Sequence, residues 1–139
     1  MLSSSSGYDC WIKKFDSSGN EDTANWNKIF ENKTSDFYEN IFGVKTDQQN
    51  SLIAAGYGFD LASGTSSEDW FIRKFYSNGA EETENGWVKI YSGSAVNGND
   101  RALAVNIDSS GNIYAVGYGS NLVGGTSGND WWIKKFLVK

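Results

Sequence analysis

Pairs of basic residues recur along this chain, and a ring of such pairs would bind an anion. The pairs are Lys13-Lys14, Arg73-Lys74 and Lys134-Lys135. Each pair lies in a segment that reads as a β-strand, where neighbouring side chains point to opposite faces. We therefore expect one member of each pair to lay its aliphatic stem over an aromatic ring, and a cationic ring is the less favoured interpretation.

Six tryptophans could bind sugars, because an indole face packs well on the C–H groups of a sugar ring. They are Trp11, Trp26, Trp70, Trp87, Trp131 and Trp132. All six lie on or beside expected strands. Packing in a core or between sheets is therefore the prediction, with sugar stacking as the alternative.

Catalytic and metal chemistry have little support in the sequence. The chain has no histidine, which removes Ser-His-Asp and Cys-His catalysis and every histidine-ligated metal site. Its single cysteine, Cys10, forms neither an internal disulfide nor a zinc cluster. Asp16, Asp47 and Asp108 lack the neighbouring carboxylates of a calcium loop and read as turn residues. No pair among the 17 acidic residues stands out as a glycosidase pair, so we expect no enzyme activity, no metal and no cofactor.

The length and net charge of the chain limit the number of domains and the kinds of partner that it can bind. The 139 residues suit one domain, and aromatic residues make up 15% of the chain, which is typical of a folded protein. The net charge of −5 argues against nucleic acid, which requires a basic surface. No apolar run approaches the roughly 18 residues that a membrane span needs.

An internal repeat organises the chain. DCWIKKF at residues 9–15 recurs as DWFIRKF at 69–75 and as DWWIKKF at 130–136. Residues 36–75 align without gaps on 97–136, with 15 of the 40 positions identical. The expected unit is a single domain, 1–139, with repeats at about 9–68 and 69–129 and a partial third at 130–139.

One repeat reads as four short strands, illustrated by residues 101–107, 112–118, 131–136 and 87–91. Alternation predicts Leu103, Val105 and Ile107 on one face of the first strand, with Ala102 and Ala104 on the other. Apolar residues on both faces indicate that each sheet lies between neighbours. No segment of useful length has a helical period.

The turns between these strands follow one steric rule. DSSG occurs at 16–19 and 108–111, and YSNG at 76–79. Each predicts a tight turn that ends in a glycine with positive φ. Asn50 takes the glycine position in DQQN at 47–50, and asparagine tolerates the left-handed conformation best after glycine.

The repeat resembles the bacterial β-propeller repeats of the SBBP and delta-60 type. The resemblance rests on residues 99–118, which end in DSSGNIYAVGY, and on DWWIKKF at 130–136. It implies an all-β fold of four-stranded antiparallel β-propeller blades, about two per chain. It also implies an extracellular or cell-surface location.

Polar loops at one rim of the sheets are the best candidates for ligand binding. The loops span residues 32–39, 60–69, 93–100 and 121–130. The candidate ligand-binding residues are Asp69, Asp100, Arg101, Asn121 and Asp130. For Asp69 and Asp130 the alternative is a structural role, in which each caps the turn that ends its loop.

The expected strands number nine, one more than two blades need. Propellers close with about four to eight blades, so two blades would leave apolar faces and strand edges in water. We expect an unstable monomer whose ring is completed by copies of itself or by missing repeats. The predicted function is a non-enzymatic binding or scaffold module for protein or glycan. The alternatives are a lectin with sites between blades and a purely structural repeat.

Overall fold

The computed structural model describes residues 8–30, 38–62, 67–93, 98–123 and 128–137, and these form nine strands and no helix. The strands are β1 (Cys10–Ile12), β2 (Lys28–Phe30), β3 (Glu39–Thr46), β4 (Leu52–Phe59), β5 (Glu68–Phe75), β6 (Lys89–Tyr91), β7 (Arg101–Ile107), β8 (Ile113–Ser120) and β9 (Asn129–Phe136). They make three antiparallel sheets in the orders β1-β2, β3-β4-β5-β6 and β7-β8-β9. The prediction of an all-β fold with antiparallel sheets is confirmed.

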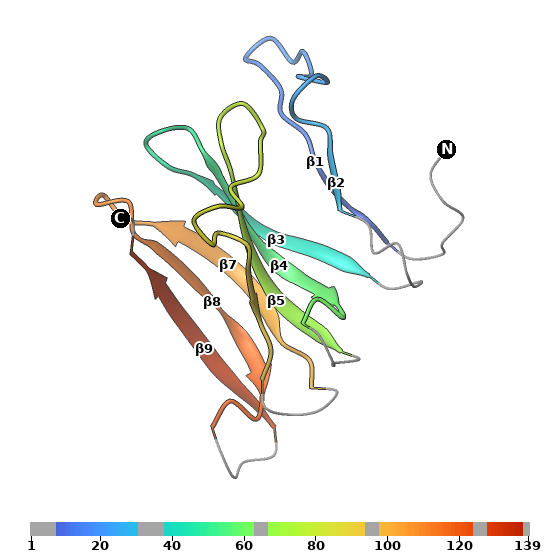
Figure 1. Cartoon of the computed structure of the whole chain (residues 1–139), viewed down its shortest axis with the longest axis vertical. Helices are drawn as coiled ribbons and strands as arrows, with labels where there is room; N and C mark the ends of the chain where they lie inside the picture. The colour runs from blue at the N-terminus through green and yellow to red at the C-terminus, as the bar shows by residue number, and fades with distance from the viewer. Residues whose placement is uncertain (1–7, 31–37, 63–66, 94–97, 124–127, 138–139) are drawn as a thin grey trace.

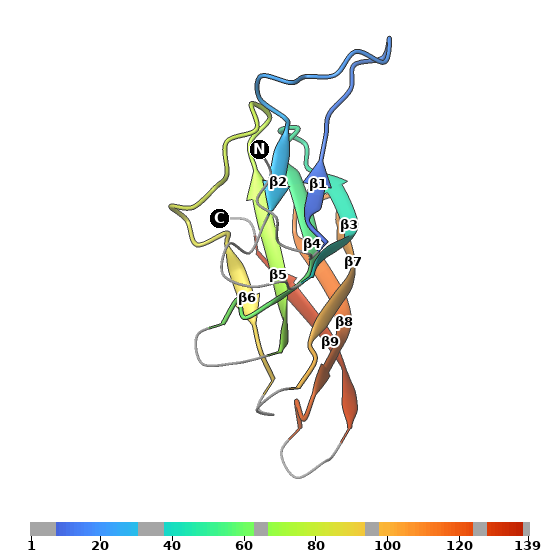
Figure 2. The same cartoon turned by 90° about the vertical axis from the view of Figure 1, so that its right-hand side faces the viewer.

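The three sheets lie side by side in chain order, from β1–β2 at the upper right to β7–β9 at the lower left (Figure 1). Within each sheet, consecutive strands pair with one another. Seen from the side, the strands of the two larger sheets run roughly along the long axis of the molecule (Figure 2). The sheets approach closely at β3 and β7, where a Cβ atom on Gly43 would lie 3.1 Å from the backbone nitrogen of Val105. A glycine at position 43 therefore permits this spacing.

Strand β8 shows the alternation that the sequence predicts. Ile113, Ala115 and Gly117 are buried, whereas the side chains between them are half-buried. The buried set faces the four-stranded sheet and joins its core. Because side chains alternate between the two faces of a strand, every second residue of β8 belongs to its buried face.

Strand β7 departs from its predicted alternation. The register shifts by one residue between Ala102 and Ala104, so a β-bulge lies at Leu103. Ala102 and Val105 are both buried on the same side, and Leu103 is exposed. The expected grouping of Leu103 with Val105 and Ile107 is therefore wrong, because a bulge adds one residue to the strand and reverses its faces.

The same bulge occurs one repeat earlier. In β3 the register shifts between Ile41 and Gly43, and Phe42, at the position of Leu103, is exposed. Two bulges at one repeat position show that the irregularity belongs to the repeat. Each bends the first strand of its sheet.

Two apolar cores lie between the sheets. The larger one joins Ile53, Ala55, Trp70 and Ile72 of the four-stranded sheet to residues of β7 and β8. The smaller one joins Ala54 and other residues on the opposite face of the four-stranded sheet to the β1–β2 sheet. The four-stranded sheet is thus covered on both faces, as predicted, and burial of its apolar area is the main force holding the three sheets together.

All four turns have the predicted conformation. The φ angles are 85° at Gly19, 59° at Asn50, 79° at Gly79 and 85° at Gly111. At 108–111 the carboxylate of Asp108 accepts hydrogen bonds from the backbone N–H groups two and four residues later. The side-chain amide of Asn112 also donates to Asp108, and this bond lowers the pKa of the carboxyl.

Gly111→Val is expected to lower the free energy of unfolding by about 1–3 kcal/mol, since a β-branched residue is strained at positive φ. Gly111→Asn is expected to cost clearly less, because Asn50 already holds this conformation one repeat earlier. Guanidinium unfolding of both variants provides the measurement. Equal losses for valine and asparagine would contradict the turn assignment.

Three phenylalanines at one repeat position differ in burial. We expect Phe15, Phe75 and Phe136 to be equivalent and buried, but only Phe75 is fully buried. Phe136 is half-buried, and Phe15 is 55% exposed. The prediction is wrong for Phe15 because no sheet in the described part of the chain covers that face of β1–β2.

Candidate functional site

The structure brings the five predicted ligand-binding residues to one end of the sheets. Asp69 pairs with Gly58 across β4 and β5, and Asp130 pairs with Gly119 across β8 and β9. The backbone N–H of Asp100 donates to the carbonyl of Glu68, which joins this end of the two larger sheets. Within the four expected loops, residues 32–37, 63–66, 94–97 and 124–127 lie outside the described residues.

Asp100 is fully buried at this end, in a cradle of backbone N–H groups. Its carboxylate accepts from Gly93 at 2.6 Å and from Ser120 at 3.0 Å. A Cβ atom on Gly119 would lie 2.1 Å from the same carboxylate, so the cradle requires a glycine. Burial raises the pKa of Asp100, and the two backbone hydrogen bonds oppose that rise.

Arg101 makes a two-point contact with the buried carboxylate of Glu68. Its Nη2 donates to Oε1 at 2.7 Å, and its Nε donates to Oε2. The hydrogen bond with Glu68 raises the pKa of Arg101, and the guanidinium lies 4.6 Å from the ring centre of Tyr57. Because Glu68 and Tyr57 belong to the four-stranded sheet, Arg101 links it to β7.

Asp69, Asn121 and Asp130 hold the loops in place. Asp69 accepts from the N–H of Ala62 at 2.8 Å, and Asp130 accepts from Val123, at the same repeat position, at 3.2 Å. Asn121 has a φ of 54° and its N–H donates to the carbonyl of Gly128. These bonds agree with the capping interpretation of the two aspartates, and ligand binding by the five residues stays a prediction.

The basic pairs lie over aromatic rings, as the sequence predicts. Lys13 lies 3.9 Å from the ring centre of Trp11, and Lys14 lies 5.6 Å from that of Trp26. One repeat later, Lys74 is 5.4 Å from the ring centre of Trp87 and ion-pairs with Asp47 at 3.0 Å. Stem packing and local ion pairs thus account for these lysines.

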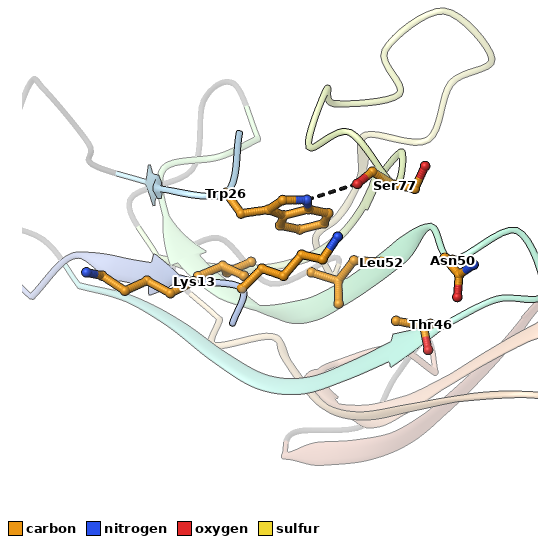
Figure 3. Close-up of a pocket in the computed structure, with 8 residues that line it drawn as sticks. Lys13, Trp26, Thr46, Asn50, Leu52 and Ser77 are labelled. Carbon is orange, nitrogen blue, oxygen red and sulfur yellow. Dashed lines mark hydrogen bonds between the residues drawn. The ribbon is translucent and has the colours of Figure 1, made fainter. Parts of the chain in front are cut away.

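A groove of about 380 Å³ opens between the β1–β2 sheet and the four-stranded sheet (Figure 3). Trp26 forms one wall and Leu52 lies opposite, with Thr46 and Asn50 at one side. The indole Nε1 of Trp26 donates to the carbonyl of Ser77 at 3.0 Å, and the side chain is 4% exposed. Trp26 therefore serves the core and offers little face to a ligand.

The second interface between sheets repeats the first. Trp26 packs on Phe75 with ring centres 6.4 Å apart at 58°, and Trp87 packs on Phe136 at 6.2 Å and 52°. A groove of about 770 Å³ beside Trp87 is lined mainly by charged and polar residues. Both junctions thus use the same aromatic pair at the same repeat position.

Two tryptophans have large exposed faces. Trp131 is 90% exposed, although Trp70 at the same repeat position is fully buried. Trp131, Tyr118 and Asn129 line an open pocket of about 280 Å³ on the outer face of β7–β9. Trp11 is 60% exposed on the outer face of β1–β2. The sequence predicted apolar faces in water for two isolated blades but did not single out Trp131 and Trp11, which no sheet in the described part of the chain covers.

Cys10 is buried, and burial raises the pKa of its thiol to about 12. We expect Cys10 in the folded chain to resist alkylation by iodoacetamide at about pH 8, because the thiolate is the reactive form. The same reagent should label the chain rapidly in guanidinium. Labelling is measured by mass spectrometry, and equal rates in the two conditions would contradict the burial of β1.

Other site types have no geometric support in the described residues. No group of three or more Cys, Asp or Glu side chains there is arranged to hold a metal ion. No helix in that part of the chain is long and apolar enough to cross a membrane. Comparison of the chain with protein-family models and with curated proteins finds no match.

Proposed function

We propose that this chain is a non-enzymatic binding and scaffold module built from β-propeller blades. In this reading the β3–β6 sheet is one complete blade, and the sheets before and after it are parts of two further blades. The module presents flat apolar faces to other protein surfaces.

The exposed outer face of β7–β9 is the observation that carries this proposal. It presents Trp131 and Ile133, which are 90% and 68% exposed. Their counterparts in the preceding sheet, Trp70 and Ile72, are fully buried against a neighbouring sheet. An exposed apolar face whose counterpart one repeat earlier is buried is typical of a protein interaction surface.

Light scattering over a range of protein concentrations tests the scaffold function. We expect assemblies of defined stoichiometry, with mass well above the 15.3 kDa of one chain. Each chain contributes three sheets, so two copies stacked end to end would supply six, a number that suits a closed propeller. A chain that stays monomeric at high micromolar concentration and melts cooperatively would contradict the proposal.

Glycan binding is the second candidate, and the pocket at Trp131 favours it. An exposed indole stands there beside a tyrosine ring and the side chain of Asn129, a combination suited to the C–H groups and hydroxyls of a sugar. A glycan array screened with the native chain and with Trp131→Ala tests it. Binding to particular sugars that is lost in the variant supports a lectin. An array without binding contradicts glycan binding and leaves the scaffold function as the only candidate.

A further inference from the structure

The repeat gives each sheet two faces with different partners. In the four-stranded sheet, the face with Trp70 and Ile72 packs on the sheet that follows in the chain, and we call it the forward face. The opposite face, with Ala54 and Phe75, packs on the sheet that precedes it, and we call it the backward face. Both junctions in the chain therefore join the forward face of one sheet to the backward face of the next.

Two faces in the described part of the chain have no such partner. The forward face of β7–β9 carries Trp131 and Ile133, paired across the sheet with Tyr118 and Val116. The backward face of β1–β2 carries Trp11, paired with Ile29, and both are exposed. The two uncovered faces are thus one forward face and one backward face.

The uncovered backward face already has the arrangement of a docked one. On the backward face of β7–β9, Lys134 lies 4.1 Å from the ring centre of Trp132. At the same repeat positions in β1–β2, Lys13 lies 3.9 Å from the ring centre of Trp11. Trp132 in turn packs on Trp70, with ring centres 5.1 Å apart.

We propose that the forward face of β7–β9 docks on the backward face of β1–β2 in a second copy of this chain. Trp131 of one copy packs on Trp11 of the next, as Trp70 packs on Trp132 within the chain. This deepens the proposed scaffold function and rests on it, because it names the partner and the residues of contact. Since the two faces differ, the contact is head-to-tail and propagates into a ring or a filament.

A mixing experiment with two charge variants tests the proposal. Trp131→Glu blocks the forward face and Trp11→Glu blocks the backward face. We expect the native chain to assemble, and each variant alone to weaken assembly by about tenfold or more, because a central tryptophan often dominates an interface. An equimolar mixture retains one intact pair of faces, so light scattering should show two-chain complexes.

Matched controls separate a lost contact from a lost fold. Val123→Glu changes another exposed apolar residue, which lies between β8 and β9 and outside both strands, and should leave assembly unchanged. Circular dichroism and melting of the dilute variants report folding. If either tryptophan variant misfolds, Ile133→Glu and Phe15→Glu change the same two faces at exposed positions.

Three outcomes would overturn the proposal. If Trp131→Glu dissociates the assembly but Trp11→Glu does not, two forward faces meet each other. If both variants assemble like the native chain, the contact lies elsewhere, for example at the open edge of β9. In these two outcomes the proposed interface is wrong but the scaffold function survives. The third outcome, a native chain that stays monomeric, contradicts the interface and the scaffold function together.

Discussion

Phe75→Ala should lower the free energy of unfolding by about 3–5 kcal/mol, the usual cost of deleting a large buried side chain. Phe75 is 1% exposed and packs on Trp26, so its removal leaves a cavity between the β1–β2 sheet and the four-stranded sheet. Guanidinium unfolding followed by circular dichroism measures the loss. The titration uses protein dilute enough for light scattering to show single chains.

Phe15→Ala is the matched control, because Phe15 has the same repeat position and is 55% exposed. Its expected loss is below about 1 kcal/mol, as for most changes at exposed positions. A loss below about 1 kcal/mol for Phe75→Ala as well would refute the packing of these two sheets.

Arg101→Ala is expected to cost about 3 kcal/mol, near the lower end of the range for a broken buried ion pair, because Arg101 itself is partly exposed. The change strands the buried carboxylate of Glu68 without its two guanidinium donors. It also removes the contact with Tyr57. The same unfolding titration measures this loss.

Glu81→Ala provides the comparison for Arg101. Glu81 ion-pairs with Arg73 at 3.3 Å, and both side chains are partly exposed. The expected loss is at most about 1 kcal/mol, the usual value of a pair near water. Similar losses for Arg101→Ala and Glu81→Ala would show that Arg101 has no special role in joining β7 to the four-stranded sheet.

Local sequence rules predicted the strands and turns well. Asn50 has positive φ as expected, because the turn depends on one steric requirement that the residue type reveals. The strand expected at 87–91 begins two residues later, at Lys89. The bulge at Leu103 was missed because one extra residue leaves the composition of the segment unchanged and keeps its length within the usual range for a strand.

Burial was harder to predict than secondary structure. Cys10, Trp70 and Trp131 share one repeat position, yet Trp131 is almost fully exposed and the other two are buried. The difference arises because another sheet packs on the face that carries Trp70, whereas no sheet in the described part of the chain covers Trp131, and such packing is a tertiary property. For the same reason, the sequence predicted where the polar loop residues gather but not that Asp100 would be enclosed by Gly93 and Gly119.

Coverage of the four-stranded sheet on both faces has a consequence for the motions of the chain. Amide hydrogens of β4 and β5 should exchange with solvent only when the whole structure opens, because both faces of these strands are packed. The β1–β2 sheet has only three residue pairs and one packed face, so its amides should exchange through a separate, less costly opening. Unfolding would then begin at the β1–β2 sheet and reach the four-stranded sheet later. Docking of a second copy on β1–β2 would slow hydrogen exchange of its amides before that of the other sheets.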